Sequence, residues 1–466
     1  MPVTKNILNI ALIIGAGLLL YSVLVFITPS VQDFFIPFIV GLFVGLFVKD
    51  LEKGTLLGFT TAFIGCFLFE YTPTSFYLLS IPKIGLSLIQ GLIAILGSAF
   101  SVKLCMAGRR KFVLYSLLIF ILLSFVVNAT IFNTFVLKRV SFEPAPEGYA
   151  FDGFLYLKTF YLMKRGHGYY RAFGMAFDQD RRLTGTPPAI FGWRLPTIFW
   201  IWSTLLPANG TYLNYAFTFF SLLCICSTFI FARKFIPDEW ALLASFLLAP
   251  YLLYAAMSFW FPFAEYWGFF FALFSLTFFC YHKQFESALF ALLAVLTREL
   301  MIFVPVAGLL ASVSSKNRKK IIIWILPLVC FSIFFMIHYL AVKPKLVHAP
   351  FDLSAWLHGG FGFVKSTLGF GLNFFAKGEM LKFLLLFLAL LGVLMLPRRG
   401  EKMIFMACLL LPVFIFFIVG GPWRDYWGII YMPFILIYAP MFFGNLSGYP
   451  LFNPKVHSNN EGGCSN

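Results

Sequence analysis

The chain has 466 residues, of which 61% are hydrophobic, 20% aromatic and only 12% charged. This composition excludes an ordinary soluble globular protein, in which about 45–50% of residues are apolar and about 25% charged. A mean hydropathy of +0.88 and repeated apolar runs of about 18 residues or more predict a polytopic helical membrane protein. Short basic loops on the cytoplasmic side of a membrane explain the formal net charge of +16, so we expect no nucleic-acid partner.

The N-terminal part, residues 1–111, is predicted to be a module of four membrane helices. The helices are expected at about 7–28, 33–48, 55–72 and 84–106. Lys53 and Arg109 fall in connections on one side, and the positive-inside rule places that side and the N-terminus in the cytoplasm. In the second helix, Gly41 and Gly45 form a G-x-x-x-G pattern, which lets a neighbouring helix approach closely.

The second part, residues 112–446, is predicted to be a larger membrane domain, followed by a short cytoplasmic tail at 447–466. Its first helix begins at the cytoplasmic basic cluster and runs outward, so the polar interval 137–194 is expected outside the cytoplasm. Residues 195–207 are apolar but number only about thirteen, which favours a helix lying in the outer interface. Further helices are expected at about 112–136, 211–232, 240–258, 263–281 and 321–341, with three more after an external segment at 343–380. The prediction is an all-α polytopic protein with about 12 spanning helices.

The segment from Glu286 to Val313 departs from this alternation of spanning helices. Both of its flanks are basic and therefore cytoplasmic, yet only about 28 residues lie between them, too few for two spans. We expect a re-entrant pair of short helices with the sequence LTREL, residues 296–300, at its tip. Arg298 and Glu299 are adjacent there, so each needs a partner of its own.

Ionisable residues at membrane depth indicate a function or a specific partner, because each costs about 2.5–3.5 kcal/mol on insertion scales. The candidates that face the outside or a cavity are Asp152, Glu265, Arg298, Glu299, Arg424 and Asp425. A carboxylate can activate a hydroxyl, and the planar fork of an arginine can hold a phosphate through two hydrogen bonds. The outer interval adds His167 and Arg194, although a histidine between two glycines is also typical of a turn. The six histidines have no spacing that is typical of metal ligands, so no metal site is predicted from them.

From its fifth helix onward, the chain resembles the GT-C glycosyltransferases, multispanning enzymes that use polyprenyl-phosphate-linked sugars. After Asp152-Gly153, the stretch FLYLKTFYLMKRGHGYY is similar to their first external loop, where an acid precedes a short amphipathic helix ending in Gly-His/Asp-Gly-Tyr-Tyr. The same order continues with PPAIFGWRLPTIFWIWSTLLPANG, with Glu265 at a helix start and with LTREL. The resemblance covers about residues 112–445. These enzymes often carry two adjacent acids where this chain has an acid and a glycine.

The resemblance implies transfer of a sugar from a polyprenyl phosphate to an acceptor hydroxyl on the extracytoplasmic face, with inversion at the anomeric carbon. Asp152 would be the general base, and Arg298 and Arg424 would stabilise the leaving lipid phosphate. The supporting residues would be Glu265, Glu299, His167, Arg194 and Asp425. The implied partners are the lipid-linked donor, a glycan, lipid or protein acceptor, and membrane lipid. A divalent cation, Mg²⁺ or Mn²⁺, is the one cofactor that the resemblance leaves open, and the missing second acid argues against tight binding.

Two other classes of function are compatible with the residues. A transporter or lipid flippase also uses broken helices and buried charges, although the sequence has no internal repeat. A non-enzymatic membrane assembly subunit is favoured if Asp152, Arg298 and Arg424 lie far apart. Arg424 and Asp425, flanked by two tryptophans, are also compatible with an interfacial anchor. A transferase requires these groups together at one face of the protein.

Overall fold

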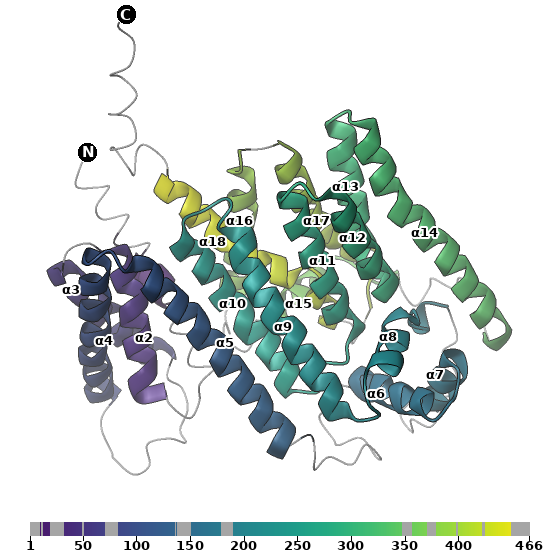
Figure 1. The fold of residues 1–466 in the computed structure, drawn as a ribbon, viewed down its shortest axis with the longest axis horizontal. Helices are drawn as coiled ribbons and strands as arrows, with labels where there is room; N and C mark the ends of the chain where they lie inside the picture. The colour runs from purple at the N-terminus through teal and green to yellow at the C-terminus, as the bar shows by residue number, and fades with distance from the viewer. Residues whose placement is uncertain are drawn as a thin grey trace, which may run out of the picture.

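The computed structural model of the protein is built of helices within the residues that it describes (Figure 1). These residues are 10, 13–18, 32–48, 51–69, 83–135, 137, 151–178, 190–346, 357–370, 379–397, 399–421 and 425–448. A single isolated β-bridge, between Leu357 and Gly420, is recorded among them. Most of the helix expected at 7–28 and nearly all of the tail at 447–466 lie outside the described residues.

The elements follow one another along the chain as helices joined mostly by short connections. In order they are α2 (Gln32–Phe47), α3 (Leu51–Phe69), α4 (Lys83–Met106), α5 (Arg110–Phe135), α6 (Phe151–Lys164), α7 (Tyr169–Asp178), η2 (Ile190–Gly192), α8 (Thr197–Leu205), α9 (Gly210–Ala232), α10 (Asp238–Met257), α11 (Ala264–Cys280), α12 (Gln284–Thr297), η3 (Glu299–Ile302), α13 (Phe303–Ser314), α14 (Arg318–Val342), η4 (Lys343–Lys345), α15 (Phe361–Gly369), α16 (Glu379–Leu394), α17 (Arg399–Ile418), η6 (Asp425–Ile430) and α18 (Met432–Gly448).

The helix boundaries agree closely with the apolar segments of the sequence, because polar caps mark several of the ends. The side chain of Asn209 accepts a hydrogen bond from the backbone N–H of Thr211, at 2.8 Å, and thereby starts α9. Asn317 does the same for α14 through the N–H of Lys320, at 3.1 Å. The expected external segment 343–380 contains a helix that was not predicted, α15. That helix packs against η6, which only the tertiary structure brings next to it.

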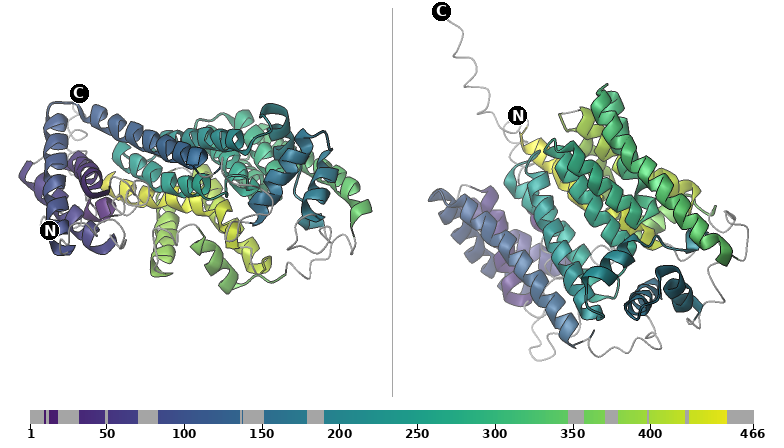
Figure 2. Two further views of the ribbon diagram at one scale, coloured as in Figure 1. Left: turned by 90° about the horizontal axis from the view of Figure 1, so that it is seen from below. Right: turned by 45° about the vertical axis from the view of Figure 1, so that its right-hand side comes forward.

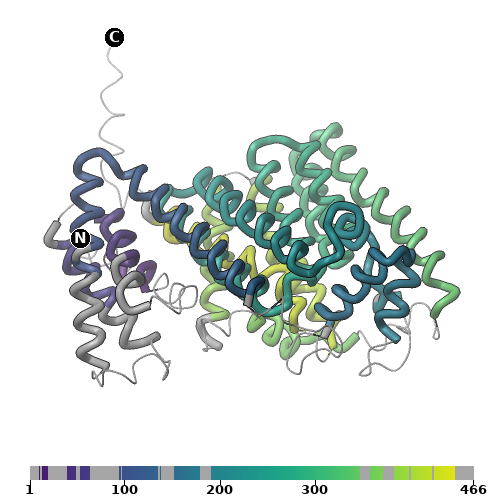
Figure 3. The backbone as a smooth tube through the Cα atoms, turned by 60° about the horizontal axis from the view of Figure 1, so that its bottom comes forward, coloured from purple at the N-terminus to yellow at the C-terminus, as the bar shows by residue number. Residues whose placement is uncertain are grey.

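The predicted pair of short helices is present as α12 and α13, and LTREL lies at the turn between them. The backbone leaves the helical conformation at Arg298 (φ −146°, ψ 114°) and continues through η3 into α13. The turn reaches the first turn of α11, where the side chain of Arg298 contacts Glu265. Both helices are therefore shorter than a span, and their junction is buried in protein, as such a backbone break requires. The two helices pack against α11, α14 and α17, and Figure 3 traces the backbone of this part of the chain.

Five described helices are long and apolar enough to cross a membrane, judged by length and composition. They begin at Arg110, Gly210, Asp238, Arg318 and Gly400. The most apolar part of α14 is only 17% buried within the protein, and its outward positions include Ile322, Val329 and Ile333. Hydrocarbon rather than water suits such a surface. These helices are those of a helical membrane protein. Five further apolar helices have 10–17 residues, short of the roughly 20 that a span needs.

The N-terminal helices α2, α3 and α4 lie together at one side of the protein, next to α5 (Figure 1). The G-x-x-x-G pattern explains how closely α2 crosses α4. A Cβ atom on Gly41 would lie 2.1 Å from the carbonyl oxygen of Ala94, and one on Gly45 would lie 2.7 Å from that of Ser98. The close approach expected from these glycines is confirmed. Phe43 and Phe47 then join the group to α10 through ring contacts with Phe246 and Trp240.

The helices of the larger block share two ends with different chemistry. One end, called the basic end below, joins α4 to α5, α9 to α10, α11 to α12 and α13 to α14, and is held by an ion pair between Arg110 and Glu239 and by Lys234 over the ring of Tyr281. The opposite end carries α6, α7 and α8, which lie beside the C-terminal end of α14 in both Figure 1 and Figure 2. Tyr170 and His338 make that contact through a 3.1 Å hydrogen bond.

Candidate functional site

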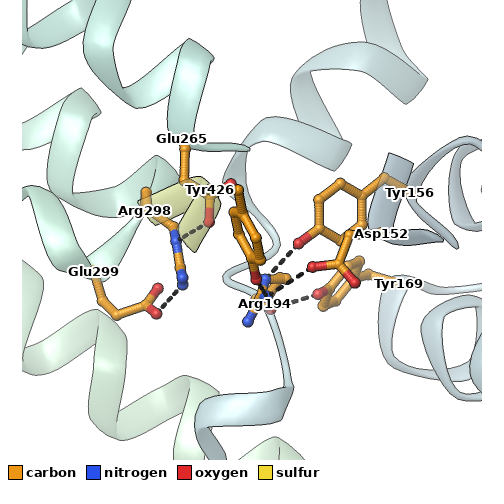
Figure 4. A network of polar contacts seen from close by, with 8 residues as sticks. All are labelled: Asp152, Tyr156, Tyr169, Arg194, Glu265, Arg298, Glu299 and Tyr426. Atoms are coloured by element: carbon orange, nitrogen blue, oxygen red, sulfur yellow. Dashed lines mark hydrogen bonds and ion pairs between the residues drawn. The ribbon is translucent and has the colours of Figure 1, made fainter. Parts of the chain in front are cut away.

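Arg194 is the centre of a polar cluster at the end of the helices opposite to the basic end (Figure 4). It lies between η2 and α8, and its side chain is 9% exposed. Its Nε donates to the hydroxyl of Tyr156, and its Nη2 donates to the hydroxyl of Tyr426 at 3.1 Å. The same Nη2 lies 3.4 Å from Oδ2 of Asp152, whose side chain is 21% exposed. Tyr169 donates to the backbone carbonyl of Arg194, so the arginine is fixed at both its side chain and its backbone.

Burial keeps the tyrosines of this cluster protonated. It raises the pKa of Tyr156, Tyr169 and Tyr426 well above the ordinary value for a phenol. The hydroxyl oxygens of Tyr156 and Tyr426 therefore accept from Arg194 as neutral groups. The positive charge of Arg194 is then left to act on the carboxylate of Asp152.

Arg298 forms a second, deeper cluster with two carboxylates. Its Nε lies 2.7 Å from Oε1 of Glu265, and the two side chains are 1% and 0% exposed. Its Nη1 contacts Oε1 of Glu299, which keeps 17% of its exposure. Its Nη2 has no hydrogen-bond partner among the described residues, and its guanidinium carbon lies 6.0 Å from the ring centroid of Trp427. A buried guanidinium between two carboxylates is tightly held.

The short helix η6 connects the two clusters. Tyr426 touches Arg194, and the next residue, Trp427, touches Arg298. The site thus gathers segments that are far apart in the sequence, at 152–169, 194, 265, 298–299 and 426–427 (Figure 4). α15 packs against η6, and the hydroxyl of its Thr367 bonds to that of Tyr431, the residue after η6, at 2.9 Å.

The structure brings together five of the residues singled out from the sequence: Asp152, Arg194, Glu265, Arg298 and Glu299. Asp425 is exposed and directly precedes Tyr426, so it lies at the edge of the site. His167 follows Gly166, whose φ of +91° forms the turn between α6 and α7, and no contact of its side chain with the two clusters is found among the described residues. Arg424 lies outside the described residues.

Sequence reasoning missed the aromatic partners of the site. Tyr156 lies four residues after Asp152, one helical turn away, and this spacing alone could have indicated it. Tyr426 and Trp427 carry no such local signal. His338 was also missed, although it is a histidine within a membrane helix. Its Nδ1 bonds to Tyr170 at 3.1 Å, and the ring lies against the segment that carries Arg194.

Close packing explains why glycine follows Asp152. A Cβ atom on Gly153 would lie 2.4 Å from the backbone oxygen of Phe259. A backbone atom cannot easily move away to relieve such a contact. Phe259 itself has a positive φ of 59° in the turn between α10 and α11. A second acidic residue next to Asp152, which the resemblance to GT-C enzymes leads one to look for, therefore has no room in this fold.

We expect Gly153→Ala to destabilise the protein by about 1–3 kcal/mol, the usual cost of overpacking a close contact. Gly174→Ala on α7 is the matched control, because its Cβ would meet only Trp193 at an ordinary 3.5 Å. Thermal unfolding of the purified variants in detergent measures the difference. Equal midpoints for the two variants would contradict the close contact at Gly153.

The described residues around Asp152 do not fit a tightly bound divalent cation. Mg²⁺ and Mn²⁺ require several oxygen ligands, whereas Oδ2 of Asp152 faces the guanidinium of Arg194. In the part of the chain that the structure describes, no group of three or more His, Cys, Asp and Glu side chains is placed to hold a metal ion.

The fold and the site define a helical membrane protein with a buried polar network at one end of its helices. Comparison of the chain with protein-family models, with curated proteins and with solved structures finds no match. The likeness to GT-C enzymes therefore stays a prediction from the sequence.

Proposed function

We propose that the protein is a glycosyltransferase of the GT-C type, which moves a sugar from a polyprenyl phosphate to an acceptor hydroxyl. The observation that supports it most is the joint placement of Asp152, Arg194 and Arg298 at one end of the helices. Asp152 also lies at the same end as Tyr426, which is two residues from Arg424. A transferase needs these segments together, whereas an opposite placement of Asp152 and the 424–426 segment would exclude it.

In the proposed reaction, Asp152 is the general base. One of its oxygens is held by Arg194, and the partly exposed carboxylate can accept the proton of the acceptor hydroxyl as that oxygen attacks the anomeric carbon. The bond from the anomeric carbon to the phosphate oxygen breaks, and its electron pair leaves with the lipid phosphate. The leaving group is already a stable anion, so it requires positive charge rather than a proton. A single displacement of this kind inverts the anomeric centre.

The charge balance limits what Arg298 can do for the phosphate. The network in Figure 4 holds three carboxylates and two guanidinium groups, and Arg298 is paired with Glu265 and Glu299. Nη2 of Arg298, which has no hydrogen-bond partner among the described residues, is left to donate to a phosphate oxygen. A dianionic or monoanionic phosphate next to this excess of carboxylates needs another cation. Arg424, close in sequence to the site, is the residue that we propose for this role.

The membrane orientation belongs to the same proposal. The basic end, which carries residues such as Arg110, Lys234 and Lys283, faces the cytoplasm by the positive-inside rule. The site then faces the extracytoplasmic side, where a lipid-linked sugar is presented, and α8 lies in the outer interface. The N-terminus is cytoplasmic, and the chain crosses the membrane about 12 times when its shorter apolar helices are included. Residues 1–111 form an accessory module in this arrangement.

The test is donor turnover by the purified protein in lipid vesicles. A panel of radiolabelled polyprenyl-phosphate sugars is supplied together with extracted membrane glycans and lipids as acceptors. We expect one donor to be consumed, with release of an equal amount of polyprenyl phosphate and transfer of the label to an acceptor. Consumption of no donor in the panel would contradict the proposal.

A lipid flippase is the second candidate, because the buried pair of Arg298 and Glu265 lies at a break between two short helices, an arrangement that transporters use. A flippase would move the same labelled lipid across the vesicle bilayer without cleaving it. Protection of the label from an added membrane-impermeant reagent, followed over time, detects this movement. Movement without cleavage supports the flippase, and cleavage with release of polyprenyl phosphate supports the transferase.

A further inference from the structure

We propose that Arg194 takes, at Asp152, the place that a divalent cation takes in a metal-dependent active site, so that the reaction needs no added cation. The inference rests on the proposed transferase function, because it concerns the same carboxylate. It assigns Arg194 as the positioning residue of Asp152. From the sequence, Arg194 was predicted only as a supporting residue.

The first observation is that Arg194 is held in place before any substrate binds. Tyr156 and Tyr426 accept from its Nε and Nη2, and Tyr169 donates to its backbone carbonyl. These three tyrosines come from three different elements, α6, η6 and α7. The side chain is 9% exposed, so it cannot turn into solvent without breaking both side-chain bonds. A cation fixed in this way needs no reorganisation when charge develops nearby.

The second observation is that the two oxygens of the Asp152 carboxylate have different surroundings. Oδ2 lies 3.4 Å from Nη2 of Arg194, while no hydrogen bond to Oδ1 is found among the described residues. The guanidinium therefore fixes one oxygen and leaves the other for the acceptor hydroxyl. A bound cation in a metal-dependent site performs the same two tasks, orienting the carboxylate and leaving it able to act.

The third observation is that, among the residues that the structure describes, a divalent cation has neither ligands nor a favourable field at this position. The neighbouring position that could supply a second carboxylate is Gly153, where even a Cβ atom would lie 2.4 Å from the backbone of Phe259. The charged group in contact with Oδ2 in the described part of the chain is the positive guanidinium of Arg194, which repels Mg²⁺ or Mn²⁺. The neutral tyrosines around it supply no charge to offset that repulsion.

The first arm of the test uses the wild-type protein. Donor turnover is measured after extensive dialysis against EDTA, and again with millimolar Mg²⁺ or Mn²⁺. We expect rates equal within about twofold, because Arg194 supplies the positive charge. Loss of turnover in EDTA with recovery in Mn²⁺ would overturn the inference. Binding of Mn²⁺ is followed separately by electron paramagnetic resonance. Mn²⁺ bound by the wild type and lost in Asp152→Asn would overturn it as well.

The second arm removes the guanidinium and returns it from solution. Arg194→Ala is expected to lower kcat by at least about 100-fold. Added guanidinium ion is expected to raise the kcat of this variant by at least about tenfold. Arg171→Ala, an exposed position on α7, is the control that neither loses activity nor responds to guanidinium. Wild-type kcat in Arg194→Ala, or recovery with Mn²⁺ but not with guanidinium, would overturn the inference.

The two proposals fail in different ways. If the wild type turns over no donor, the transferase function fails, and the Mn²⁺ binding measurement still decides whether this site takes a cation. If the wild type is active but depends on Mn²⁺, only the inference about Arg194 fails. Should Arg194→Ala not fold, the EDTA and Mn²⁺ measurements on the wild type remain decisive.

Discussion

Asp152→Asn is expected to lower the rate of the proposed sugar transfer by a factor of about 10² to 10⁴, the usual contribution of a general base. The amide has nearly the shape of the carboxylate but cannot take the proton of the acceptor hydroxyl. Asp152 is 21% exposed, and the amide oxygen of an asparagine can still accept from Arg194, so the substitution should leave the fold in place. Turnover of the radiolabelled donor, measured at saturating concentration, gives kcat for both proteins.

Asp178→Asn is the matched control for this substitution. Asp178 is an exposed carboxylate at the end of α7, on the same side of the protein and outside the two clusters. Its amide variant is expected to keep wild-type turnover. Retention of full turnover by Asp152→Asn would remove the general base from the proposal. A similar loss in both variants would indicate a general disturbance of the outer helices instead.

Arg298→Met is expected to lower the free energy of unfolding by about 3–5 kcal/mol, the cost of breaking a buried ion pair by removing one partner. The substitution leaves Glu265, which is fully buried, and Glu299 with no guanidinium between them. Glu299→Gln should cost clearly less, because the pair of Arg298 and Glu265 then remains balanced. The order of the two effects follows from the charge count of the cluster. Thermal unfolding of the purified proteins in detergent gives the order of their midpoints.

A triple variant provides the internal control for this prediction. Arg298→Met combined with Glu265→Gln and Glu299→Gln removes the buried charges altogether, and we expect it to recover a large part of the lost stability. Arg171→Met, at an exposed position on α7, should leave the midpoint unchanged. A midpoint for Arg298→Met above that of Glu299→Gln would contradict the buried cluster described here.

The helices and the broken pair could be predicted from the sequence because their signals are local. Apolar run length, basic connections and caps such as Asn209 are read within a few residues, and they fix where a helix begins and ends. The short distance between two basic flanks was enough to predict the pair α12 and α13 with LTREL at its turn. α15 escaped prediction because its partner η6 lies in a different part of the sequence.

The candidate site could be predicted only as a set of residue types. Arg298 and Glu299 were found because ionisable groups are costly in a membrane domain, and Asp152 was found from the resemblance to GT-C enzymes, but the sequence did not show which side chain each of them contacts. Arg194 meets Asp152 at a separation of 42 residues and Tyr426 at a separation of 232. In helices that are apolar on every side, periodicity does not show which face meets which neighbour.

The sequence alone therefore determined the class of protein, the positions of most helices and the residues that deserve chemical scrutiny, since these follow from composition and from patterns over one or two helical turns. Only the tertiary structure decided that Glu265 faces Arg298, that three tyrosines hold Arg194, and that Gly153 leaves no room beside Asp152. Those contacts depend on how closely distant helices pack, and packing is set by the shapes of many side chains together.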